Sequence, residues 1–226
     1  GLAVRTIASA EELAGALAAG PRTWFALVNP HGEIFPTPGP GRWRETLDAV
    51  RRYVNYGGIW WETGAYSFHR AYYREGALWK SEPVGGDGLQ YLRLPIGDGE
   101  VDEPASPLVA TETGKVWLGD ALAARVAQSA SSVNRCVRST EAAPATLLVE
   151  GLGKGFIGGY RLDGWGTIWR VGGFNPDPEI TAAVAVAATL HQFNSPPAPL
   201  PPAGTRYLYH ATLVPETFWQ RLFSKR

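Results

Sequence analysis

The chain has 226 residues, of which 45% are hydrophobic and 19% charged, a composition typical of a globular protein and not of a disordered one. Its 21 basic and 21 acidic side chains cancel to a formal net charge of zero, and no cluster of lysine or arginine stands out. This pattern argues against nucleic acid or an anionic membrane surface as the partner. The most apolar stretch, residues 180–190, is too short to cross a bilayer, so no membrane span is expected.

Cysteine and methionine usage limits the chemistry of the chain. Cys136 is the only cysteine, so the chain forms no internal disulfide and builds no cysteine-based metal site. We interpret Cys136 as a small buried hydrophobe, because free cysteine is among the most buried residue types. The chain contains no methionine and begins at Gly1, as a piece of a longer product would. Removal of a signal peptide would explain this beginning, as trimming by other means would, and we expect a secreted or periplasmic protein.

The first predicted elements are a helix and a strand. Ser9 with Glu12 three residues later forms a capping box, which predicts a helix over residues 10–19. The apolar run 23–28 predicts a short strand that is buried on both faces. A loop over residues 29–41, with four prolines and three glycines, is expected to follow this strand.

The next segments predict a crossover between parallel strands. Apolar residues recur with a helical period from Trp43 to Tyr56, and the glycine pair 57–58 ends this predicted helix. Residues 59–61 then predict a second short strand. A strand, a helix and a strand in this order predict a βαβ unit, and such units form parallel sheets.

The middle of the chain predicts a long excursion followed by regular elements. Residues 85–107 are rich in glycine, proline and acidic residues, and residues 116–130 have a helical pattern. Three strands are predicted after them, over residues 146–149, 156–161 and 167–171.

The carboxy-terminal part predicts the domain organisation. An apolar helix is expected over residues 180–193, which closes an α/β domain over residues 1–193. Residues 194–204 hold five prolines and predict an extended tether, because proline fixes φ and lacks a backbone donor. Residues 205–226 then form a short extension.

Residues 23–68 resemble the core of the class I glutamine amidotransferase-like superfamily. In that family a glycine pair leads into a strand, and about five residues later a cysteine nucleophile stands at a sharp turn. In this chain the pair is Gly57-Gly58, the strand is residues 59–63, and Gly64 occupies the position of the nucleophile. Because glycine has no side chain, the thiolate mechanism is excluded. The His-x-Glu pair that the family carries near the end of its domain is also absent here.

The resemblance implies a flavodoxin-like parallel sheet flanked by helices, with a strand-rich later part. Trehalose-utilisation-type proteins and the trimerisation domain of certain β-galactosidases are similar in keeping this fold without the cysteine. Both belong to carbohydrate-processing proteins, and for that reason we expect a carbohydrate-related function. This expectation rests on analogy of fold.

Polar side chains follow the two predicted parallel strands at the edge where an open sheet binds ligands. We expect a site there with Glu62, His31 and Glu33 as candidate catalytic residues, because a shared cleft raises the pKa of a glutamate toward that of a general acid or base. The candidate binding residues are Asn29, Trp61, Tyr66 and His69. The alternative is that Glu33 and Glu62 are carboxylates that pair locally or cap backbone donors.

Metal binding would draw on the same residues. His31, Glu33, Glu62 and His69 carry ligand atoms that suit zinc, but no recognised metal-binding spacing such as HExxH occurs. We therefore expect neither a metal ion nor another cofactor.

Three functions remain open. The first is a non-catalytic binding or assembly module of a carbohydrate-related protein, with a carbohydrate ligand and a homo-oligomer or a larger polypeptide as partners. The second is a hydrolase that acts through Glu62 with His31 or Glu33. The third is a structural subunit of a larger complex, which the nine tryptophans and the proline-rich tether favour.

Overall fold

The computed structural model describes residues 3–64, 66–94, 108–129, 137, 139, 144–151, 154–161, 166–173 and 177–194. All of them belong to one compact unit, residues 1–196, while residues 197–226 form a second unit. The predicted tether beyond residue 194, the predicted extension and Cys136 lie outside the described residues.

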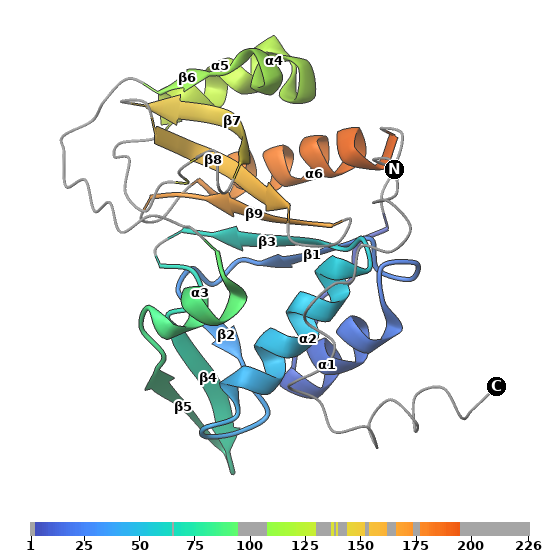
Figure 1. The fold of residues 1–226 in the computed structure, drawn as a ribbon, viewed down its shortest axis with the longest axis vertical. Coiled ribbons are helices and arrows are strands. Elements are labelled where there is room, and N and C mark those ends of the chain that lie inside the picture. The colour runs from blue at the N-terminus through green and yellow to red at the C-terminus, as the bar shows by residue number, and fades with distance from the viewer. Residues whose placement is uncertain are drawn as a thin grey trace. The chain divides into compact units, whose positions relative to one another are not determined.

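A six-stranded mixed sheet forms the centre of the compact unit (Figure 1). Its first three strands are parallel and its remaining pairings are antiparallel. In spatial order the strands are β1 (Ala26–Asn29), β3 (Ile59–Thr63), β9 (Thr167–Val171), β8 (Lys154–Arg161), β7 (Ala145–Gly151) and β6 (Val109–Ala110). The parallel pairing of β1 with β3 confirms the predicted βαβ crossover, and β7, β8 and β9 confirm the predicted strand-rich later part.

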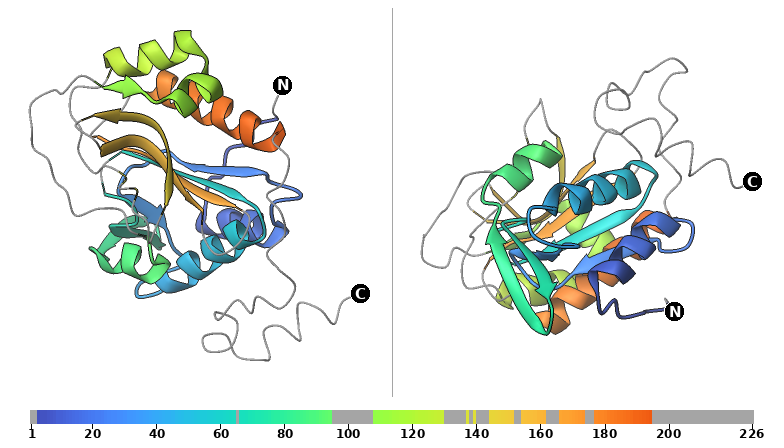
Figure 2. Two further views of the ribbon diagram at one scale, coloured as in Figure 1. Left: turned by 45° about the horizontal axis from the view of Figure 1, so that its top comes forward. Right: turned by 90° about the horizontal axis from the view of Figure 1, so that it is seen from below.

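Helices cover both faces of this sheet, as Figure 2 shows from two further directions. One face packs against α1 (Ala10–Ala19) and α2 (Trp43–Asn55). The opposite face packs against α4 (Glu112–Leu118), α5 (Asp120–Ser129) and α6 (Pro178–Asn194). The chain is therefore a mixed α/β protein with a helix-flanked sheet. None of the described helices combines the length and the apolar character that crossing a bilayer requires.

Local chemistry explains where two of these helices begin and end. The Ser9 hydroxyl accepts the backbone N–H of Glu12 at 3.1 Å, which caps α1 as the sequence predicted. The helix predicted over residues 116–130 is instead two helices. Thr111 caps the first one, which starts earlier, and Gly119 at φ 75° separates it from the second.

A second, three-stranded sheet was not predicted. It consists of β2 (Ile34–Pro36), β4 (Arg70–Glu75) and β5 (Leu78–Pro83), and the short helix α3 (Asp87–Leu92) follows it. The prediction that residues 29–41 form only a loop was wrong, because this segment contains β2. These strands are short or carry charged residues, so no apolar run marks them.

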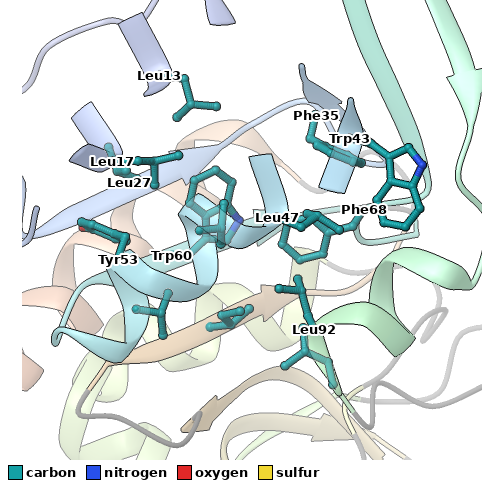
Figure 3. Close-up of a cluster of buried hydrophobic side chains, with 14 of the residues drawn as sticks. Leu13, Leu17, Leu27, Phe35, Trp43, Leu47, Tyr53, Trp60, Phe68 and Leu92 are labelled. Atoms are coloured by element: carbon teal, nitrogen blue, oxygen red, sulfur yellow. The ribbon is translucent and has the colours of Figure 1, made fainter. Parts of the chain in front are cut away.

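The hydrophobic core has two parts, one on each face of the central sheet. The two adjacent tryptophans of β3 point to opposite faces of the sheet, because successive strand residues alternate in direction. Trp60 packs into the first cluster, which Figure 3 shows, and Trp61 packs into the second. Each large side chain buried in this way contributes about 1.5–3 kcal/mol to stability.

Candidate functional site

Three parallel strands bring Asn29, Glu62 and Arg170 into one row. In the register of the sheet Asn29 lies opposite Glu62, and Glu62 lies opposite Arg170. The residues two positions earlier in each strand are core residues of the first cluster, so the row lies on that same face. The strand ends thus place an amide, a carboxyl and a guanidinium side by side.

The carboxyl group of Glu62 is completely buried. Trp60 Nε1 donates to Glu62 Oε1 at 2.7 Å. Asn29 Nδ2 lies 3.3 Å from Oε1 and 3.1 Å from Oε2, and it also donates to the backbone carbonyl of Ile34 at 2.9 Å. The carboxyl group therefore accepts hydrogen bonds from two buried side chains.

Burial dominates the titration of Glu62. Transfer out of water penalises the charged form and raises the pKa of this carboxyl group to about 8. The hydrogen bonds from Trp60 and Asn29 and the positive charge of Arg170 act in the opposite direction. Arg170 is itself buried, and its guanidinium donates to the hydroxyl of buried Ser67. The result is a continuous buried polar network at the ends of the parallel strands.

The segment after β3 turns sharply at Gly64. This glycine has a φ of 74°, and its N–H donates to the carbonyl of Val171 at 2.8 Å. Glycine adopts this left-handed conformation without the steric cost that a Cβ atom brings. The prediction that Gly64 stands in a turn directly after the strand is confirmed. The chain then passes through Ser67 and Phe68 into β4.

The remaining polar candidates lie around this network. His31 is exposed, and its backbone N–H donates to Asn29 Oδ1 at 3.2 Å. Glu33 is half-buried and accepts through its backbone carbonyl from the N–H of His69 at 3.1 Å. The ring of His69 stacks on that of Tyr66 with centroids 4.8 Å apart. The described contacts of the Glu62 carboxyl group are with Asn29, Trp60 and Arg170, and the side chains of His31 and Glu33 are not among them.

Trp61 lies on the opposite face of the sheet. Its ring stacks on Trp169 at a centroid distance of 5.3 Å, and its Nε1 donates to Thr189 Oγ1 at 3.1 Å. The side chain is fully buried. Trp61 and Glu62 therefore do not face the same site.

Sequence reasoning missed three members of the network: Trp60, Ser67 and Arg170. One signal was available for Arg170, since it is the single charged residue in the strand sequence TIWRV of β9. A charged residue in an otherwise apolar strand is either paired or functional, because an isolated buried charge is too costly. Ser67 carries no comparable signal.

No group of three or more metal-ligating side chains occurs among the residues that the structure describes. Neither the protein-family profiles nor the curated proteins compared with this chain match it.

Proposed function

We propose that this chain is a non-catalytic binding or assembly module of amidotransferase-like architecture, belonging to a secreted, carbohydrate-related protein. The observation that carries this proposal is the complete burial of the Glu62 carboxyl group, with Asn29 and Trp60 as its donors. A general acid or base must come within hydrogen-bond reach of its substrate. Glu62 meets protein donors on both oxygens instead.

The turn after β3 supports the same proposal. Gly64 stands where the resembling family carries its nucleophile, and it offers only backbone groups there. The neighbouring parallel strands β1, β3 and β9 support the comparison with a flavodoxin-like sheet. In such open parallel sheets, ligands bind beyond the carboxyl ends of the strands. A ligand at this edge would meet the half-buried rings of Tyr66 and His69 and the exposed side chain of His31.

The Glu62→Gln variant tests the proposal, because it replaces a carboxyl group that can exchange a proton with an amide of the same shape that cannot. Turnover is measured for the wild type and the variant on a panel of glycans, esters and glutamine. We expect background turnover for both proteins, including ammonia release from glutamine. Melting temperatures measured in parallel show whether the variant is folded.

A hydrolase is the second candidate, and one observation favours it. The pKa of Glu62 is raised to about 8, so the carboxyl group keeps its proton at neutral pH, as a general acid must. In that case the wild type turns over a substrate of the panel, and the Glu62→Gln variant loses about two or more orders of magnitude in kcat. This outcome would overturn the non-catalytic proposal.

A further inference from the structure

Among the described strands, β5 forms an edge of the small sheet with one side unpaired. Strand β5 pairs with β4, and no described strand pairs with its other side. Five of its six residues are exposed, and Leu78 and Trp79 keep 66% and 49% of their surface accessible. Such an edge presents unpaired backbone groups that another strand can bind.

The hydrogen bonds of β4 show which residues of β5 face outward. The N–H of Arg70 donates to Glu33, and the carbonyl of Tyr72 accepts from Thr37, so both residues point toward β2. The alternate residues Ala71, Tyr73 and Glu75 therefore point toward β5, where they meet Glu82, Lys80 and Leu78. The backbone groups of Trp79, Ser81 and Pro83 are thus directed to the open edge.

We propose that β5 pairs antiparallel with β5 of a second copy of this chain, with Ser81 on the twofold axis. This inference rests on the assembly part of the proposed function and names its partner. In this register the two Ser81 residues exchange both backbone hydrogen bonds. Each Trp79 N–H donates to the carbonyl of the opposing Pro83. Pro83 has no N–H, so the carbonyl of the opposing Trp79 receives no bond in return, and the ladder ends at this pair.

The charges of β5 select this register. Around Ser81, Lys80 of each copy lies opposite Glu82 of the other, in the pair type whose side chains come closest. An axis at Lys80 would instead place two lysines opposite each other, and an axis at Glu82 would oppose two glutamates. Like charges directly opposite are destabilising, and opposite charges are stabilising. A twofold interface must be self-complementary. Only an axis at Ser81 places the lysine of each copy opposite the glutamate of the other.

The contacts that Lys80 and Glu82 make within their own chain leave both side chains available for ion pairs with a second copy. Lys80 pairs with Glu75 on the surface of its own chain, where both side chains are about half exposed. Glu82 accepts only a backbone N–H, from Gly41 at 2.8 and 3.0 Å, so its negative charge has no cationic partner among the described contacts. The opposing Lys80 would supply one.

The apolar face of β5 agrees with the same register. Trp79 stacks on Tyr72 with centroids 4.9 Å apart and planes within 5° of parallel. Residues opposite each other in a sheet share a face, so Trp79 of one copy would lie beside Pro83 of the other. The pairing would cover the exposed ring of Trp79 with an apolar residue.

The full chain tests the pairing in sedimentation velocity and in size-exclusion chromatography with light scattering. We expect a concentration-dependent species of twice the chain mass of 24.4 kDa. Ser81→Pro removes an outward N–H and no backbone bond to β4, and it also removes the exposed hydroxyl that accepts from Arg70 Nη2 at 2.9 Å. It should give a monomer with unchanged circular dichroism. Lys80→Glu should weaken the dimer by about tenfold or more, because two ion pairs become two like-charge contacts.

The charge-exchanged double variant Lys80→Glu/Glu82→Lys should restore the dimer. Glu75→Gln is the matched control, since it removes the same intrachain ion pair as Lys80→Glu and leaves the proposed interface intact. A monomer at all concentrations, or a dimer that survives both Ser81→Pro and Lys80→Glu, would overturn the pairing. These results leave the turnover test of Glu62→Gln untouched, so failure of the pairing and failure of the non-catalytic proposal are distinguishable.

Discussion

Glu62 follows two tryptophans at the end of a buried strand, and this position places its carboxyl group inside the protein. Glu62 was expected at a ligand-binding cleft, but the structure buries its carboxyl group. Burial of a carboxylate is costly, and the donors and the positive charge around Glu62 offset only part of that cost, since its pKa stays raised to about 8. The network therefore fixes the ends of three strands relative to one another.

The raised pKa of Glu62 predicts how stability depends on pH. The unfolded chain releases this proton near its ordinary pKa of 4.5, whereas the folded chain holds it up to about pH 8. Stability from this group is thus complete below pH 4.5 and is lost as pH rises toward 8, by up to about 5 kcal/mol. Urea unfolding at pH 5, 6.5 and 8.5 measures this loss.

The Glu62→Gln variant serves as the reference for that series. Its amide does not titrate, so the difference in unfolding free energy between wild type and variant should change with pH in favour of the variant. All other titrating groups cancel in this difference. Equal pH slopes for the two proteins would show that Glu62 does not carry the raised pKa.

At the scale of the elements, helix α4 packs very closely against strand β7. A Cβ atom on Gly114 in α4 would lie 1.9 Å from the backbone carbonyl oxygen of Leu148 in β7. A backbone atom cannot rotate away as a side chain can. The helix therefore reaches the sheet only because this residue is glycine.

Replacing Gly114 with alanine should destabilise the protein by about 2 kcal/mol or more, because helix and strand must separate. The matched control is Gly15→Ala in α1, where a Cβ atom would meet nothing within 4 Å. That change should raise stability by about 0.5–1 kcal/mol through helix propensity alone. Thermal unfolding of both variants checks the pair of predictions, and equal effects would contradict the close packing of α4 on β7.

The whole compact unit depends on one shared sheet between two cores. Strand β3 supplies Trp60 to one cluster and Trp61 to the other. Loss of packing on one face is therefore transmitted through the strand to the opposite face. We expect the two clusters to unfold together and not as separate layers.

Trp61→Ala should lower the unfolding free energy by about 3–5 kcal/mol, since it removes a fully buried ring and its stack on Trp169. Circular dichroism and tryptophan fluorescence should report coincident transitions, as in two-state unfolding. Trp61→Phe keeps a ring in this place and should lose clearly less. Separate transitions for the two probes would show that the two cores are independent.

Local patterns in the sequence determined the regular elements of the central sheet. The capping box at Ser9, the helical period from Trp43 and the apolar run at residues 59–61 each depend on neighbours within one or two turns of chain, so they can be recognised without the fold. The resemblance of residues 57–64 to the amidotransferase-like pattern predicted a turn at Gly64, and the structure contains that turn. The order of these elements was enough to predict a parallel crossover.

Tertiary structure alone decided which side chains join Asn29 and Glu62 in the network, and it alone decided the second sheet. Arg170 and Ser67 are 103 residues apart in the chain, and they meet only because β9 inserts beside β3. The pairing of β2 with β4 depends on backbone hydrogen bonds. Side-chain patterns predict it poorly, because β2 has only three residues and β4 is rich in charged residues. Trp61 and Glu62 point to opposite faces of the sheet, because successive strand residues alternate. The helices packed on each face then determine what that face contacts.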